Sequence, residues 1–237
     1  MDLGWLPTNR RPATEHFPGA PANPKHRLRK AHGGGKLVSE VRAIALVPHM
    51  LARAMVRLIL FFAGSVAIIK LSWWSLRDWR SHGFYRFFAF ELLLALVLQN
   101  ARVWFRNPLS TRQLVSWLLG AASMALAIEG FRLLRVIGRP SPKSARSTDL
   151  GFENTTTLVT VGAYRFIRHP LYTSLLALVG CAYLKSPLTV RSVALALSAS
   201  GFLVATSVAE EKENLVRLGA TYADYMKRTR RFVPFLF

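Results

Sequence analysis

Long uncharged apolar runs alternate with short arginine-rich connectors along most of this chain of 237 residues. A helix of about 20 apolar residues crosses a bilayer, and basic residues collect at the ends of such helices. Hydrophobic residues make up 51% of the chain although its formal net charge is +20, a combination that suits few soluble folds. We therefore expect an all-α fold, a polytopic membrane bundle of about five transmembrane helices that ends in a helical hairpin.

The basic charge points to membrane lipids as partners. Nucleic acid would be the alternative, but the lysines and arginines cluster at the ends of apolar runs rather than along one soluble face. Anionic headgroups are therefore the expected counter-charge, and no nucleic acid is expected. Cys181 is the single cysteine, which excludes an internal disulfide framework and a cysteine-rich metal site.

The N-terminal part precedes the first long apolar run. Residues 1–36 are rich in Pro, Gly and basic residues and show no apolar periodicity, so we expect a disordered basic tail. Residues 37–57 mix apolar positions with arginines in a pattern typical of an amphipathic interfacial helix, which Pro48 would bend.

Residues 58–137 are expected to form three transmembrane helices. The predicted spans are residues 58–76, 87–105 and 113–134. Two of these spans contain an acid, Glu91 and Glu129, and an ionisable group in a span is often functional. Because both acids lie within about two turns of a span end and near arginines, a structural or interfacial role is favoured.

Residues 138–237 form the remaining region. It contains apolar runs over 171–184 and 192–209, separated by Lys185, Ser186 and Pro187. The first run is short for a span, so the pair predicts a tight helical hairpin whose two ends return to one side of the membrane.

Five crossings create a topological conflict. The N-terminal tail and the C-terminus would lie on opposite sides, yet both are basic and the positive-inside rule would keep both in the cytoplasm. Three solutions stay open. The tail is translocated against the rule, residues 38–57 contain a further crossing or re-entrant segment, or translation starts at Met50 or Met55.

The first polar segment whose side chains could take part in binding or catalysis leads into the hairpin. Pro170 suits the first position of a helix, which makes His169 the cap residue. Free N–H groups and the positive end of the helix dipole would favour an anion there, with Arg165 or Arg168 as a fork. Tyr172 would share the face of His169.

A plainer interpretation exists for the same segment. Arg165 and Arg168 would be interfacial anchors for lipid phosphate, and Tyr164 and Tyr172 would belong to an aromatic belt.

The second polar segment follows the hairpin. Glu210, Glu211 and Glu213 are three of only twelve acids, and they stand at a membrane exit. A cationic ligand would explain carboxylates at this apolar boundary. The alternative is a solvated helix in which Glu213 and Arg217 form an i,i+4 pair, and this alternative is accepted for Glu213.

Together these motifs resemble the isoprenylcysteine carboxyl methyltransferase and phospholipid methyltransferase superfamily. The motif residues are Gly162, Tyr164, Arg165, Arg168, His169, Pro170, Tyr172, Glu210, Glu211, Asn214, Gly219, Tyr222 and Tyr225. The match covers about residues 138–237, and the stretch 152–160 looks like the bacterial branch. The resemblance therefore implies that residues 138–237 are the catalytic region of a bacterial inner-membrane protein. Its site would face the cytoplasm, with a cytosolic cap formed by the C-terminal segment.

The resemblance also implies S-adenosylmethionine as methyl donor and a lipophilic acceptor, either an isoprenylcysteine-like carboxylate or a lipid amine. Its implied cofactor-binding residues are Tyr164, His169, Pro170, Tyr172, Glu210 and Glu211, and its implied catalytic residues are Arg168 and Glu211. No metal is required. A carboxylate acceptor is already ionised, whereas an amine must lose a proton before or during attack.

Two other function classes remain as alternatives. One is a non-catalytic membrane scaffold or lipid-binding protein that retains an old pocket. The other is an intramembrane lipid reductase, for which the chain offers no dinucleotide-binding motif beyond scattered arginines.

Overall fold

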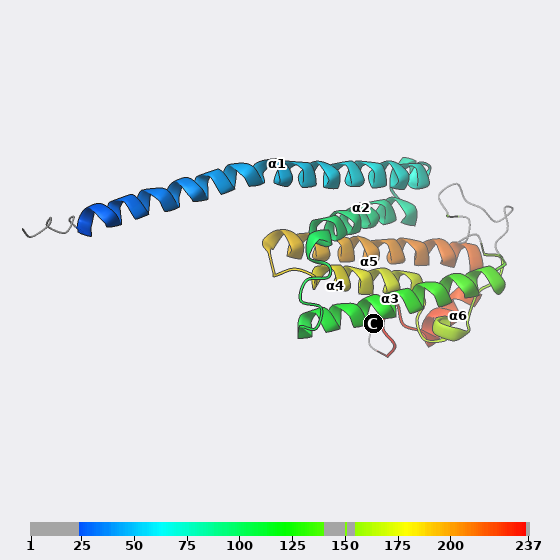
Figure 1. Cartoon of the computed structure of the whole chain (residues 1–237). Coiled ribbons are helices and arrows are strands. Elements are labelled where there is room, and N and C mark those ends of the chain that lie inside the picture. Colours follow the sequence, from blue (N-terminus) through cyan, green and yellow to red (C-terminus); the bar gives the residue numbers. More distant parts are fainter. Residues whose placement is uncertain (1–23, 140–149, 151–154, 236–237) are drawn as a thin grey trace, which may run out of the picture. The chain divides into compact units, whose positions relative to one another are not determined.

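The computed structural model describes residues 24–139, 150 and 155–235 (Figure 1). In this part of the chain the regular structure is helical, apart from isolated bridge residues, which include a parallel bridge between Ile167 and Arg230. The expected all-α bundle is confirmed. The chain divides into two units, residues 1–54 and 55–237, and the site lies in the second.

Six α-helices are described. They are α1 (Pro24–Ser72), α2 (His82–Asn100), α3 (Thr111–Val136), α4 (Pro170–Tyr183), α5 (Val190–Leu218) and α6 (Ala220–Arg228). Four segments are long and apolar enough to cross a membrane, namely Val47–Ser72, His82–Val103, Thr111–Val136 and Val190–Leu218. The protein is therefore an integral membrane protein. Helix α4, with 14 residues, is only about 21 Å long and so is shorter than the hydrocarbon core of about 30 Å.

The N-terminal part differs from the prediction. Helix α1 runs without a break from Pro24 to Ser72 and passes through Pro48. Residues 24–36 are thus helical rather than a disordered tail, and residues 37–57 continue into the first span instead of forming a separate interfacial helix. Glycine costs about 1 kcal/mol and proline about 3 kcal/mol inside a helix, so neither residue forbids one. Residues 1–23 lie outside the described residues.

This continuous helix bears on the topological conflict. No re-entrant turn interrupts residues 38–57, because α1 spans all of them. The fold therefore removes one of the three solutions and leaves the other two.

Two predicted helix boundaries also move. Helix α2 begins at His82 rather than near residue 87, because the Ser81 side chain accepts a hydrogen bond from the Phe84 N–H and caps the helix. Helix α5 continues to Leu218 instead of ending at residue 209, so the polar segment with Glu210 and Glu211 is helical.

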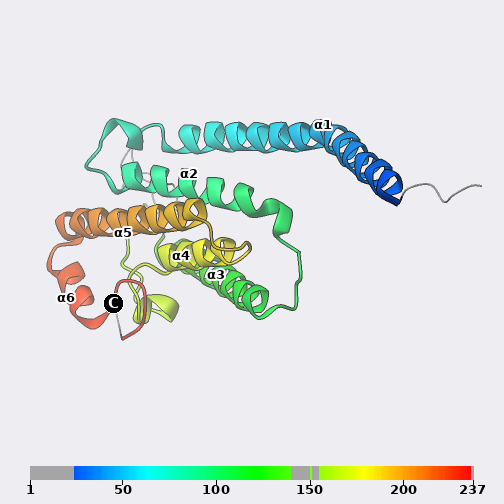
Figure 2. The same cartoon turned by 90° about the vertical axis from the view of Figure 1, so that its left-hand side faces the viewer.

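The second unit is a layered bundle in which α2 packs on α5, α5 on α4, and α4 on α3 (Figures 1 and 2). Ala89, Ala182 and Ala199 are almost completely buried on α2, α4 and α5. Small residues at these positions let helix backbones approach closely, as is typical of membrane bundles. Large apolar side chains on the outer face of α3 are exposed, among them Leu118, Met124 and Ile128. Such a surface suits lipid tails.

The bundle has two distinct ends (Figure 2). The first residues of α2 and α4 lie at the same end as the last residues of α3 and α5. We name it the glutamate end, after Glu210, Glu211 and Glu213. The opposite end is named the lysine end, after Lys185.

At the lysine end, side chains from neighbouring helices complete the C-terminus of α4. Asn100 Nδ2 donates to the Ala182 carbonyl at 2.8 Å, and Ser116 Oγ donates to the Cys181 carbonyl at 2.8 Å. The last carbonyls of a helix have no partner within it, and in a membrane they need one. Side chains of α2 and α3 therefore supply hydrogen-bond donors to the last carbonyls of the short helix.

Candidate functional site

The site is built on the N-terminus of α4. Pro170 is the first helical residue and His169 is the cap residue, as the sequence predicts. The C-terminal segment closes over this start, because the Arg168 N–H donates to the Arg230 carbonyl at 2.7 Å and the His169 N–H donates to the Arg231 carbonyl at 3.2 Å. These bonds tie the last residues of the chain to the beginning of the hairpin.

A constrained turn precedes this helix start. Gly162 opens a short 3-10 helix with φ +59°, a conformation that a side chain would strain. The adjacent Ala163 N–H donates to Glu129 Oε1 of α3 at 3.0 Å. Glu129 therefore anchors the segment that leads to Arg168 and His169, which is a structural role.

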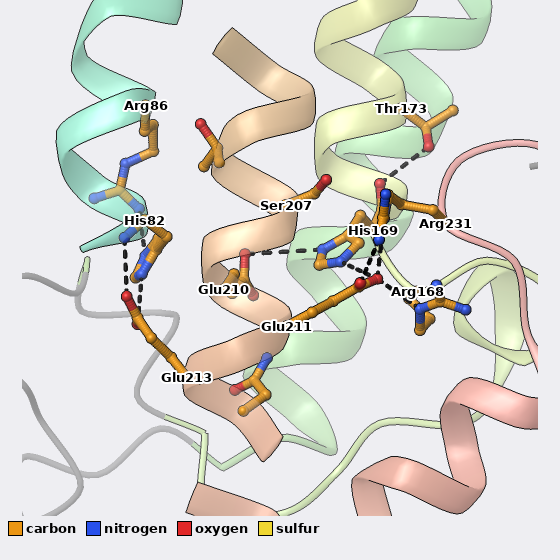
Figure 3. Close-up of polar contacts among 12 residues, drawn as sticks. His82, Arg86, Arg168, His169, Thr173, Ser207, Glu210, Glu211, Glu213 and Arg231 are labelled. Atoms are coloured by element: carbon orange, nitrogen blue, oxygen red, sulfur yellow. Dashed lines mark hydrogen bonds and ion pairs between the residues drawn. The ribbon is translucent and has the colours of Figure 1, made fainter. Parts of the chain in front are cut away.

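Glu211 is the centre of a buried ion-pair network (Figure 3). Its side chain is 5% exposed, and it accepts hydrogen bonds from Arg168 Nε at 2.7 Å and from Arg231 Nη2 at 2.6 Å. His169 Nε2 lies 3.3 Å from the same carboxylate. These bonds raise the pKa of Arg231. Glu211 thus joins α5, the start of α4 and the C-terminal segment.

Glu210 has a different environment from its neighbour (Figure 3). It is partly buried, and the nearest ring nitrogen, His169 Nδ1, lies 3.8 Å from its carboxylate, which is too far for a hydrogen bond. Consecutive helical residues point about 100° apart, so Glu211 turns toward the arginines while Glu210 lines a pocket.

This pocket lies between the starts and ends of the helices at the glutamate end. Its polar lining includes Glu210, His169, Arg168, Asn214 and Arg217, and its apolar lining comes partly from α3 and α4. Four tyrosines complete the walls, namely Tyr164, Tyr172, Tyr222 and Tyr225. The space open to a water-sized sphere is about 90 Å³, whereas ligand pockets usually measure about 300–1,000 Å³. A cofactor-sized ligand would therefore require the lining to move apart.

Contacts hold Tyr172 and Tyr225 in place, and two of the four tyrosines, Tyr222 and Tyr225, have raised pKa values. Tyr225 donates its hydroxyl hydrogen to the Tyr164 carbonyl at 2.7 Å, and the Tyr172 ring stacks on His169 with centroids 5.4 Å apart. Burial raises the pKa of Tyr222, as does the nearby Glu210 carboxylate, and burial raises the pKa of Tyr225. The pocket therefore combines one carboxylate with neutral aromatic faces.

The structure brings five of the predicted site residues together around the pocket, namely Tyr164, Arg168, His169, Tyr172 and Glu210. Pro170 is buried as the first residue of α4, and Glu211 lies in the ion-pair network, so neither of them lines the pocket. Arg165 lies over the Phe166 ring, with its guanidinium 5.7 Å from the ring centroid.

A second polar cluster escaped the sequence analysis. Glu213, for which a pair with Arg217 was expected, accepts from the His82 N–H at 2.9 Å and lies 2.8 Å from His82 Nδ1 (Figure 3). Arg86 Nη1 lies 3.3 Å from His82 Nε2, and both side chains are almost completely buried. The only sequence signal was the i,i+4 spacing of His82 and Arg86 on one helix face. Arg217 donates to Asn214 Oδ1 at 2.7 Å.

Comparison with known proteins adds no relative: no protein-family model, no curated protein and no solved structure matches the chain.

Proposed function

We propose that this protein is an integral membrane methyltransferase that uses S-adenosylmethionine to methylate a lipophilic acceptor. One observation carries the proposal. Glu210 presents a partly buried carboxylate, without a hydrogen bond from any described residue, to a pocket walled by four tyrosines. The motif resemblance over residues 162–225 supports the same assignment.

The residues present fit such a cofactor. A carboxylate and aromatic faces attract a cation, and a sulfonium is one. The carboxylate of the cofactor's methionine part would be favoured at the start of α4, because the N-terminus of a helix attracts an anion. Arg217, which also lines the pocket, adds a positive charge.

The lining residues would contribute to methyl transfer by orienting the reactants and by accepting a proton. When bound, S-adenosylmethionine supplies an electrophilic methyl group on a positively charged sulfur. Glu210 and the tyrosines would orient this group and exclude water, and Glu211 would hold Arg168 and Arg231 in place. For an amine acceptor, the Glu210 carboxylate or the His169 ring is available in the pocket to take the proton.

The proposal includes a location. The glutamate end faces the cytoplasm of a bacterial inner membrane, where the cofactor is made. A lipophilic acceptor then reaches the pocket from the bilayer, past the apolar side chains of Leu134 on α3 and Leu171 on α4, which line it.

The test is calorimetric binding of S-adenosylhomocysteine to the protein in lipid nanodiscs. We expect saturable binding that is lost in His169→Ala and kept in His49→Ala, because His49 is exposed and lies outside the pocket. Absence of binding by folded wild-type protein would contradict the proposal.

The same preparation separates the alternatives. Binding of a nicotinamide cofactor, with none of S-adenosylhomocysteine, would favour a lipid reductase. Binding of neither cofactor would favour a non-catalytic lipid-binding protein.

A further inference from the structure

A second recess lies at the lysine end of the bundle, away from the pocket of Glu210. It measures about 290 Å³ and is formed by the connection between α2 and α3, the start of α3 and the connection that follows α4. Its polar lining consists of Arg106, Asn107, Ser110, Arg112, Gln113 and Lys185. Three of these side chains are cationic, and none of the described residues that line the recess is acidic.

The two arginines carry charge that no described residue neutralises. Arg106 and Arg112 make no ion pair or side-chain hydrogen bond with any residue that the structure describes, and both are at least partly exposed. Guanidinium groups match the geometry of a phosphate, to which they can donate two parallel hydrogen bonds.

Lys185 is the third cation, and its position is fixed. It is 1% exposed, and its ammonium lies 3.3 Å from the centroid of the Trp117 ring and 5.0 Å from that of Trp104. Nζ also donates to Gln113 Oε1 at 3.1 Å. Burial lowers the pKa of Lys185, since it removes water from the ammonium. An anion in the recess would compensate for this lost hydration.

The length of α4 explains why such a compensation is needed. If Pro170 lies at one boundary of the hydrocarbon core, a helix of about 21 Å ends several ångströms short of the opposite boundary. Lys185 is the second residue after that helix, so its charge lies deeper than an interfacial residue would. A bilayer adapts to a short span by thinning, which brings headgroups toward this depth.

We propose that the recess binds the phosphate of an anionic phospholipid from the leaflet at the lysine end. Arg106 and Arg112 hold the phosphate oxygens, and Lys185 adds the buried charge. This site is independent of the methyl-transfer pocket.

The test is the affinity of the delipidated protein for phosphatidylglycerol, measured by native mass spectrometry in detergent. The test variant is Arg106→Gln/Arg112→Gln. The matched control is Arg102→Gln/Arg191→Gln, which removes the same charge at the same end from residues that do not line the recess. At about 1 kcal/mol for each basic residue near the lipid, we expect about a thirtyfold loss of affinity in the test variant and little change in the control.

Several outcomes would overturn the proposal. Equal losses in both variants would mean that the charge of this end attracts lipid without a site. Equal affinity for phosphatidylcholine would remove the need for an anionic headgroup. If inorganic phosphate displaces the lipid when it is present at the same concentration as the lipid, the recess binds a soluble anion rather than a lipid. Binding of S-adenosylhomocysteine, measured on the test variant, reports separately on the proposed function.

Discussion

Glu129 Oε1 lies 2.5 Å from the position that a Cβ on Gly162 would occupy. The same oxygen accepts the Ala163 hydrogen bond, so the carboxylate and the glycine fit together. The turn that leads to His169 therefore depends on the absence of a side chain at position 162.

Gly162→Ala is expected to destabilise the protein. A residue with a side chain costs about 1–2 kcal/mol in the left-handed conformation, and the clash with Glu129 adds to this cost. We expect a lower thermal midpoint in detergent and weaker binding of S-adenosylhomocysteine. Gly201→Ala is the matched control, because a Cβ at that position meets no atom within 4 Å. Equal midpoints for the two variants would contradict this account.

Glu210→Gln and Glu211→Gln are expected to fail in different ways. Glu211→Gln leaves Arg168 and Arg231 beside a neutral amide, and breaking a buried pair costs about 3–5 kcal/mol, with the lower value expected here because Arg231 is partly exposed. Glu210→Gln removes no hydrogen bond to a described residue, so stability should hold while affinity for S-adenosylhomocysteine falls. Thermal unfolding and calorimetry on the same samples distinguish the two. If both variants lose only stability, Glu210 has no part in binding.

Glu213→Ala should loosen the packing of α2 on α5. The change removes the acceptor for the His82 N–H and for Nδ1, and a lost buried hydrogen bond costs about 1–3 kcal/mol. Lys212→Ala changes the exposed neighbouring residue and serves as control. Chemical unfolding followed by circular dichroism measures both variants. An unchanged unfolding free energy for Glu213→Ala would show that these contacts do not hold the helices together.

Stability should fall at alkaline pH. Tyr222 and Tyr225 have pKa values raised by burial. A tyrosine in the unfolded chain has a pKa of about 10, so the folded state binds these protons more tightly. The stabilisation is complete below about pH 10 and is lost as the pH rises toward the folded-state values.

Tyr225→Phe checks this assignment. It should lower stability at neutral pH by about 1 kcal/mol, because the hydrogen bond to the Tyr164 carbonyl is lost. It should also make the alkaline decrease shallower. Tyr183→Phe, which removes a hydroxyl that bonds to no described residue, controls for the neutral-pH effect. Thermal midpoints between pH 8 and 11 provide the measurement.

The sequence predicted the features that depend on local chemistry. Apolar length identified the spans, and a proline at the first helical position placed His169 at the cap of α4. The start of α2 was missed because a single serine, Ser81, caps it six residues ahead of the predicted span that begins at residue 87.

What the sequence could not supply were pairings between distant residues. Glu210 and Glu211 look equivalent in the sequence. The orientation of α5 in the bundle decides that Glu210 lines the pocket and that Glu211 pairs with Arg168 and Arg231. The partner of Glu213 is 131 residues away. The contacts of Lys185 with the Trp104 and Trp117 rings likewise join α3 to two connecting segments, and no repeating pattern in the sequence predicts them.

The hydrogen bonds that α4 receives from α2 and α3 have a consequence for membrane insertion. The Cys181 carbonyl accepts from Ser116 of α3, and the Ala182 carbonyl accepts from Asn100 of α2 in addition to the Lys185 N–H. A translocon releasing α4 alone would deliver to the lipid a segment too short to cross and with unsatisfied ends. The connection from Leu184 to Thr189 is short enough for α4 to enter together with α5. Because α2 and α3 are synthesised first, they are already in the bilayer and can supply these hydrogen-bond donors when α4 and α5 are inserted.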